Sequence, residues 1–297
     1  MATSPSSSSS SSLIDEDISN PNPNSPLPFG KEPPSIFVAD VPLTEKETQF
    51  INEFRTAVST SFNDIPELDR EYWTSDHLLN RIAVARSWDM KGCITMFNTI
   101  YHFRKEKECW KYLNVPGFYQ EPEVLRRYFP WGFVGTDREG FPVLVERTGM
   151  IDLVGMHAGV GTEDFLNWVG WYHEIQERFM RRCSSMMQKN RHKMTCIIDL
   201  NGIGLRHLNK DTLSVLHKRT RLEEEHYPEV VKRIFLINTP SIFASVWNVV
   251  RRFMDEGTAS KVQILSSDYL PTLLKVSTSN SKKIKNLNGL TNYNTIL

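Results

Sequence analysis

One segment constrains the fold of this chain more than any other, because it joins two short apolar runs through a helix with almost no polar face. The runs are 234–237 (IFLI) and 262–265 (VQIL), and such runs are typical of strands buried on both faces of a mostly parallel sheet. The predicted helix over 242–254 carries apolar side chains around most of its circumference. They are Ile242, Phe243, Val246, Trp247, Val249, Val250, Phe253 and Met254.

A helix that rests on a soluble core needs an apolar stripe on one side only, so this helix needs apolar surroundings on more than one side. Two interpretations remain open. The helix is either fully buried in the core, or it forms a wall or lid over an apolar ligand and can also contact a membrane.

Composition limits the classes of protein to which the chain can belong. It has 297 residues, of which 40% are apolar, enough to bury one large core or two small ones. Its 35 basic and 35 acidic residues cancel, so no overall field directs it to nucleic acid, and any anion site must be local. Four separated cysteines without a CxxC pair indicate neither a zinc site nor a disulfide framework, and fit a reducing cytoplasm.

The N-terminal segment has the composition of a tail. Residues 1–42 hold eight serines in the first twelve positions and half of the chain's prolines, which is typical of disorder. Phosphorylation of these serines and simple solvation both remain open. The segment lacks a basic start followed by an apolar run, and no stretch approaches 18 consecutive apolar residues. We therefore expect neither secretion nor membrane spanning, and any membrane contact should be peripheral.

Regular structure is predicted from Thr44, which has capping-box spacing with Glu47 and precedes apolar residues at helical intervals. Two further helices are predicted over 76–87 and 89–108. A long helix is expected to be capped by Thr162.

Three more strands and one helix are predicted before the segment that holds runs 234–237 and 262–265. Strands over 131–136 and 143–145 should form a hairpin, and a buried strand is predicted over 195–200. The helix that follows carries Leu213, Leu216 and Leu222, and its basic run 217–221 is expected to face solvent.

Three patterns that resemble catalytic or cofactor motifs carry little weight. Segment 155–161 is glycine-rich but lacks Gly-Lys-Ser/Thr, so a surface turn is predicted there. His173 and Glu174 do not belong to an HExxH motif, because the last position of that motif is a glutamate here, and no metal site is expected. Gly202 and Gly204 lack the third glycine and the immediate helix of a dinucleotide loop.

Several separated motifs occur in the order found in one known family. They are Tyr227-Pro228-Glu229, Asn238-Thr239-Pro240, Phe253-Met254-Asp255 and Thr258-Ala259-Ser260-Lys261. With them, the chain from about Trp73 to Leu274 resembles the CRAL-TRIO family, and more closely its phosphatidylinositol transfer branch of the yeast secretory-pathway type. The resemblance implies an α/β fold in which an N-terminal helical bundle precedes a mostly parallel sheet with flanking helices and an apolar lipid cavity.

The resemblance divides the chain into four parts. A disordered Ser/Pro-rich tail is expected over 1–42 and the helical subdomain over 43–115. The lipid-binding domain is expected over 116–276, and a divergent polar and basic tail over 277–297.

The resemblance also implies a lipid headgroup site made of Arg86, Glu229, Thr258 and Lys261. These residue types suit the chemistry, since cations and hydroxyl donors bind a phosphate and a carboxylate accepts hydrogen bonds from ring hydroxyls. Thr258 is expected to open a short helical turn. Ser87 stands where the family usually has a lysine, which removes one positive charge. A structural alternative stays open, in which Glu229 and Lys261 form a supporting ion pair, Thr258 is a cap and Arg86 is a solvated arginine.

Four positions of the expected cavity wall lack the hydroxyl groups that hold phosphatidylcholine in the best-known relatives. The residues at these positions are Phe133, Leu144, Met194 and Cys196. The resemblance therefore implies binding of phosphatidylinositol but weak binding of phosphatidylcholine. The cavity or its gate is also expected to include Ile242, Phe243, Val246, Trp247, Val250, Phe253 and Met254.

Together these expectations predict a binding protein, not an enzyme, that takes phosphatidylinositol or another single lipid and needs no cofactor or metal. It would be cytoplasmic, contact membranes transiently, bind no nucleic acid and use its N-terminal tail for a possible protein partner. Three alternatives remain: a lipid-gated regulator, a carrier of a sterol or tocopherol-like ligand, and a nucleotide-using α/β enzyme built on Gly202 and Gly204.

Overall fold

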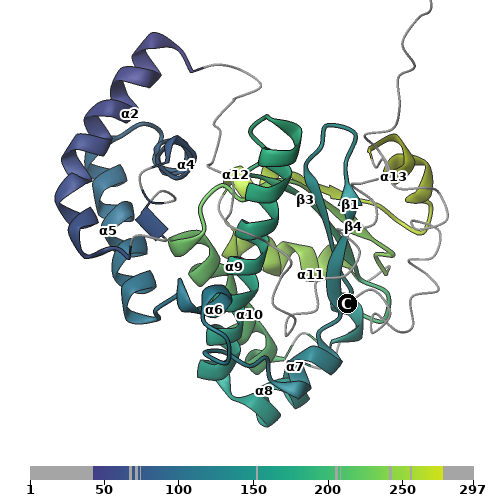
Figure 1. Cartoon of the computed structure of the whole chain (residues 1–297). Helices are drawn as coiled ribbons and strands as arrows, with labels where there is room; N and C mark the ends of the chain where they lie inside the picture. Colours follow the sequence, from purple (N-terminus) through teal and green to yellow (C-terminus); the bar gives the residue numbers. More distant parts are fainter. Residues whose placement is uncertain are drawn as a thin grey trace, which may run out of the picture.

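The computed structural model describes residues 43–66, 69–70, 73, 75–151, 153–204, 207, 209–240, 243–254 and 256–276. Both predicted tails, 1–42 and 277–297, lie outside these ranges. In the described part, a group of helices packs beside an α/β unit whose sheet is covered on both faces (Figure 1). No helix in these ranges is both long and apolar enough to cross a bilayer.

The N-terminal helices enclose a core of their own. They are α2 (Glu45–Val58), η1 (Ser59–Asp64), α4 (Asp76–Ala85) and α5 (Met90–Glu106). The capping box is confirmed, because the Thr44 hydroxyl accepts from the Glu47 amide at 3.2 Å while the Glu47 carboxylate accepts from the Thr44 amide. Both helices predicted after it are confirmed. α4 ends at Ala85. Shortly after it, Ser87 and Trp88 have positive φ angles of 49° and 61°, which lie outside the range of a right-handed α-helix.

The sheet has five strands in the order β1-β2-β3-β4-β5. They are β1 (Trp131–Thr136), β2 (Pro142–Glu146), β3 (Met194–Asp199), β4 (Val231–Ile237) and β5 (Val262–Ile264). The first two form the predicted antiparallel hairpin, and each later pair is parallel. The mostly parallel sheet is therefore confirmed.

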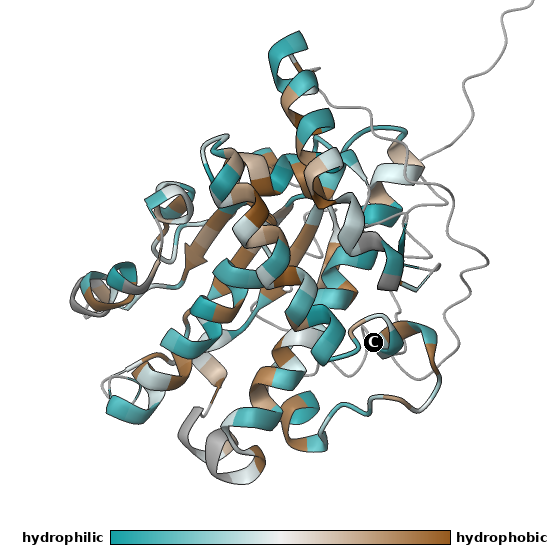
Figure 2. Ribbon diagram, turned by 90° about the vertical axis from the view of Figure 1, so that its left-hand side faces the viewer, coloured by the Kyte–Doolittle hydropathy of each residue, from teal (hydrophilic) through white to brown (hydrophobic). Residues whose placement is uncertain are grey.

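Each face of the sheet is covered by apolar side chains from helices. One face packs against α7 (Glu123–Tyr128), α8 (Leu153–Val160), α9 (Thr162–Met187), α10 (Lys210–His226) and α11 (Phe243–Val250). The other face carries Val143, Val145, Ile197 and Phe235, and is covered by α13 (Leu270–Val276) through Leu273. Figure 2 shows the apolar strands lying inside the helices, whose outer surfaces are polar. Cover on both sides explains the unbroken apolar run 234–237 of β4. The prediction of equal burial is wrong for β5, which lies at the edge of the sheet with Val262 half-buried and Gln263 and Ile264 exposed.

The glycine-rich segment 155–161 does not form the predicted surface turn. Most of it belongs to α8, and Met156 is buried in the main core. Tertiary burial therefore outweighs the low helix propensity of glycine here. Gly161 has a φ of +85° and is the N-cap of α9, so Thr162 is the first residue of that helix and not its cap.

The basic run 217–221 is not uniformly exposed either. Arg219 lies four residues after buried Val215 and four before Glu223, so it shares their face of α10. Its guanidinium donates to Glu146 at 2.8 Å and to Glu223 at 2.7 Å, beneath the helix. The helical period thus turns one cation of the run into the core, and the prediction was wrong for Arg219.

Gly202 has a packing role. A Cβ added at Gly149 would lie 2.2 Å from the backbone oxygen of Asn201, and Gly202, with a φ of +100°, allows this approach. Among the described residues, the next α-helix after β3 is α10, which begins at Lys210. In the described part of this segment, no helix starts directly at Gly202 or Gly204, as a dinucleotide site would require.

Candidate functional site

Three charged side chains meet at the amino ends of three adjacent strands. Glu229 precedes β4, Lys193 directly precedes β3, and Lys261 directly precedes β5. Because these strands are parallel, their first residues lie at one edge of the sheet. Oε2 of Glu229 lies 2.6 Å from Nζ of Lys193 and 3.1 Å from Nζ of Lys261. We call this group the Glu229 cluster.

The charges of the Glu229 cluster do not balance. Burial by itself would raise the pKa of Glu229, but the hydrogen bond from Lys193 and the charges of both lysines outweigh it and lower that pKa. The carboxylate is therefore ionised at neutral pH. Two ammonium groups share it, so the cluster has one excess positive charge.

Thr258 lies in the segment that leads to Lys261. It is half-buried and is the third residue of α12 (Glu256–Ser260), so the prediction that it opens this turn is wrong. Its carbonyl accepts from the Lys261 amide at 3.1 Å, which closes the turn just before β5. The helical bonding simply begins two residues earlier than expected.

Arg86 is exposed at the end of α4, where its guanidinium donates to the carbonyl of Ala85 at 3.0 Å. Among the described residues, no hydrogen bond or ion pair joins Arg86 to Glu229 or Lys261. The structure thus brings Glu229 and Lys261 together, with Thr258 nearby in the chain. The role of Arg86 at this site stays a prediction.

Sequence reasoning missed two cations that bear on the site. Lys193 could have been found from the sequence. Residues that directly precede adjacent parallel strands lie side by side at one edge of the sheet. Arg81 had no such signal. It is buried on α4, donates through Nε to the carbonyl of Pro228 at 2.7 Å, and forms an ion pair with Glu177 at 2.7 Å. Arg81 therefore fixes the turn that carries Glu229, which has a φ of +54°.

Buried ion pairs connect the N-terminal helices to α9. Besides the Arg81 pair, Arg104 of α5 contacts Glu174 through both terminal nitrogens, one of them at 3.0 Å. His173 in turn lies 3.1 Å from Glu223. The His173-Glu174 pair is thus engaged in side-chain interactions with neighbouring helices.

The four predicted wall residues lie on a single face of the sheet. Phe133 is paired with Leu144 and Leu144 with Cys196, while Met194 precedes Cys196 by two residues. All four are buried in the main core, beneath α9, where Phe133 stacks on Phe179 at 4.1 Å. The register therefore supports the assignment of these positions as one continuous apolar surface.

Helix α11 is apolar but only partly covered. Phe243 is buried, whereas Trp247, Val249 and Val250 are half-buried and Asn248 is exposed. Of the remaining predicted gate residues, Met254 is half-buried against the same core. Ile242 and the side chains of Val246 and Phe253 lie outside the described residues.

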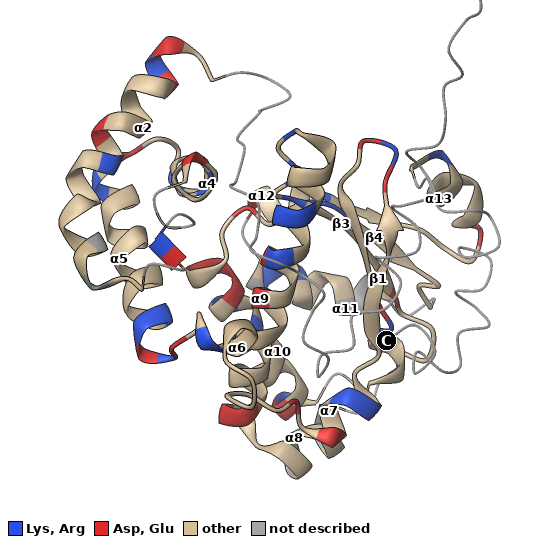
Figure 3. Cartoon of the chain, viewed as in Figure 1, with Lys and Arg blue, Asp and Glu red and all other residues tan. Residues whose placement is uncertain are grey.

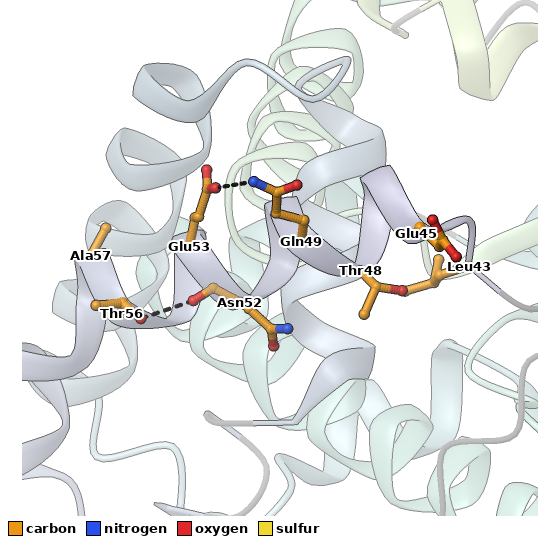
Figure 4. A pocket seen from close by; sticks show the side chains of 8 residues that line it. All are labelled: Leu43, Glu45, Thr48, Gln49, Asn52, Glu53, Thr56 and Ala57. Atoms are coloured by element: carbon orange, nitrogen blue, oxygen red, sulfur yellow. Dashed lines mark hydrogen bonds between the residues drawn. The ribbon is translucent and has the colours of Figure 1, made fainter.

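A second surface feature lies far from the Glu229 cluster. A shallow groove follows the exposed face of α2, on the outer side of the N-terminal helices (Figures 1 and 4). Most of its lining residues are polar in type, and Gln49 donates to Glu53 at 2.8 Å within it. The groove carries no cation with which to bind a phosphate. It is lined by Leu43, Glu45, Thr48, Gln49, Asn52, Glu53, Thr56 and Ala57.

Comparison with known proteins agrees with this architecture. The family model described as CRAL/TRIO domain matches residues 126–289. The chain is 30% identical to phosphatidylinositol/phosphatidylcholine transfer protein SFH12 of Arabidopsis thaliana over 217 residues, which cover 71% of this chain and 38% of that protein. It is also 30% identical to SFH9 of the same plant, named likewise, over 81% of this chain and 41% of that protein.

The chain thus spans about two fifths of the length of these curated relatives. Among solved structures, the crystal structure of Sfh5 superposes with a TM-score of 0.60 at 14% identity, covering 78% of this chain and 84% of that one. This likeness concerns the fold alone. Because the family model matches more than half of the sequence, and the sheet and its helices agree with it, the chain belongs to the CRAL/TRIO domain family.

Proposed function

We propose that this chain binds a single phospholipid, with phosphatidylinositol favoured, and exchanges it between membranes as a cytoplasmic protein that contacts bilayers transiently. One observation carries the proposal: a carboxylate and two ammonium groups meet at one edge of a sheet whose helix-covered face is apolar. The names of the relatives, which are phosphatidylinositol/phosphatidylcholine transfer proteins, support it.

The Glu229 cluster has the chemistry that an inositol headgroup requires. The ring hydroxyls donate to the Glu229 carboxylate, and the phosphodiester accepts from Lys261. Thr258 and Arg86 are proposed as further phosphate donors. Because the carboxylate and Lys261 are only 17% and 20% exposed, water screens these bonds less than it would at an open surface.

The acyl chains would lie in an apolar cavity between the sheet and helices α9 and α11. Burial of apolar surface is worth about 25 cal/mol per Å², so burial of the acyl chains supplies affinity. The protein side chains that contact the headgroup supply selectivity. The partial exposure of α11, followed by exposed Arg251 and Arg252, supports its role as a gate at the membrane surface. None of these steps requires a nucleophile, so we propose a carrier and not an enzyme.

Lys261→Ala is expected to weaken phosphatidylinositol binding by roughly tenfold to a hundredfold, because a charge-assisted hydrogen bond contributes about 1.5–3 kcal/mol. The measurement is transfer of labelled phosphatidylinositol between vesicles, with binding by the purified protein. Lys189→Ala is the matched control, since Lys189 is exposed and lies four residues before Lys193 in the chain. Transfer by Lys261→Ala at the control rate would show that Lys261 does not hold the headgroup.

Val250→Asp is expected to slow transfer at least about tenfold, because a charge on the half-buried face of α11 opposes insertion of that helix into the bilayer. Headgroup preference should change far less. Asn248→Asp places the same charge at an exposed position of the same helix and should transfer normally. Equal rates for the two variants would place the gate elsewhere.

A sterol, a tocopherol-like molecule or another weakly polar lipid is the second candidate. It is favoured by the apolar row Phe133, Leu144 and Cys196, which offers no hydroxyl to a polar ligand. Mass spectrometry of the lipid that co-purifies with the full chain distinguishes the two candidates. An inositol phospholipid supports the first, and a sterol or prenyl lipid alone supports the second.

A further inference from the structure

The Glu229 cluster contains one more cation than the proposed binding of phosphatidylinositol uses. Lys193 and Lys261 lie 2.6 Å and 3.1 Å from the same carboxylate oxygen. The side chain of Lys193 is 36% exposed, against 20% for Lys261 and 17% for Glu229. Lys193 is therefore the outer member of the group, open to a ligand while it is still held in place.

A second group of one carboxylate and two cations lies along the same edge. Glu139, in the turn between β1 and β2, contacts Lys232 Nζ at 2.5 Å and Arg233 Nη2 at 2.6 Å. Lys232 and Arg233 are the second and third residues of β4, so this pair of cations follows Glu229 closely in the chain. Basic and acidic residues alternate here, near α12 and the turn (Figure 3). The two groups together hold four basic and two acidic side chains, although the whole chain has no formal net charge.

We propose that Lys193 extends the headgroup site toward an additional phosphate, so that the protein prefers an inositol headgroup carrying a phosphate monoester over the unphosphorylated headgroup. This inference rests on the proposed function and names the ligand class of the same site. When ring hydroxyls engage Glu229 and the phosphodiester engages Lys261, Lys193 loses part of its interaction with the carboxylate. A phosphate monoester has a charge of about −1.5 to −2 and three acceptor oxygens, which Lys193 can bind.

The chemistry that Lys193 recognises occurs in two sources, a phosphorylated inositol lipid and a soluble inositol phosphate. The full chain is titrated with vesicles that contain phosphatidylinositol or phosphatidylinositol 4-phosphate at the same mole fraction. In separate titrations it receives inositol 1-phosphate or inositol 1,4-bisphosphate without membranes. Lys193→Met is compared with Lys232→Met, which removes the same charge from the same edge but from the group around Glu139.

The wild-type chain is expected to bind the phosphorylated lipid about tenfold more tightly than phosphatidylinositol, the effect of one charge-assisted contact. Lys193→Met should reduce this ratio to near one, and Lys232→Met should keep it. If the soluble bisphosphate is bound as tightly as the phosphorylated lipid, with the same dependence on Lys193, the site is supported and its ligand is soluble. If only the vesicles bind tightly, the site is supported and its ligand is the lipid.

Three results would overturn the inference. They are equal affinity for the two lipids, an unchanged ratio in Lys193→Met, and an equal loss in both variants, which would indicate general attraction to a charged membrane. Binding of phosphatidylinositol without preference would leave the proposed function intact. Failure to bind either inositol lipid would instead remove the proposed function. Thermal unfolding of both variants verifies that each is folded.

Discussion

Arg81→Met is expected to lower the free energy of unfolding by about 3–5 kcal/mol, because it leaves the buried carboxylate of Glu177 without its cation. Arg81 and Glu177 are 4% and 2% exposed, so water cannot replace the lost partner. Arg81 also holds the Pro228 carbonyl, which lies one residue before Glu229. The variant should therefore lose headgroup binding as well as stability. Chemical denaturation and phosphatidylinositol transfer measure the two effects.

Two companion variants make this result specific. Arg221→Met breaks an exposed ion pair with Glu225 and should leave the free energy of unfolding nearly unchanged. In the double variant Arg81→Met/Glu177→Met, both charges are gone, and most of the stability should return. Headgroup binding should stay reduced in the double variant, because the Pro228 carbonyl still lacks its donor. An Arg81→Met protein as stable as Arg221→Met would contradict the role of the buried pair.

Phosphatidylcholine is expected to be transferred at least about a hundredfold less well than phosphatidylinositol. A choline phosphate buried beside Phe133, Leu144 and Cys196 would lose hydrogen bonds that it makes in water, at about 1–3 kcal/mol for each group left unmet. The strand register places these three side chains directly opposite one another on neighbouring strands. The measurement is a paired transfer assay with the two labelled lipids.

The same register allows a gain-of-function test. Restoring hydroxyls with Phe133→Tyr, Leu144→Tyr, Met194→Ser and Cys196→Thr together should raise phosphatidylcholine transfer. Val143→Thr is the control, because Val143 belongs to the opposite face of the sheet, under α13. Robust transfer of both lipids by the unmodified chain would refute the prediction. A response to Val143→Thr equal to that of the fourfold variant would refute the role of this face.

Much of the fold could be predicted because its causes are local in the sequence. A strand buried on both faces has to be an unbroken apolar run, so β4 was visible in 234–237. Run 262–265 located β5 but not its burial, because an edge strand lacks a neighbour on one side. The start of α2 was visible because Thr44 and Glu47 satisfy each other's backbone donors over three residues. The positions of Glu229 and Lys261 came from motifs in family order, and parallel pairing of the strands then brought the two together.

Other features could not be predicted, because their causes join residues that are distant in the sequence. Arg81 is 147 residues from Pro228 and 96 from Glu177, and no local pattern marks that contact. Arg219 looked like one of several solvent-facing cations until the packing of α10 placed it against Glu146.

By itself the sequence determined the strands, most of the helices and the residue types of the candidate site, since these depend on local periodicity and capping. Only the tertiary structure decided which charges are buried, which cations share a carboxylate and which glycines permit close backbone contact. Those outcomes depend on which elements come within a few ångströms of each other. Lys193 shows the difference: its type and position are plain in the sequence, but its contact with Glu229 follows from the pairing of β3 with β4.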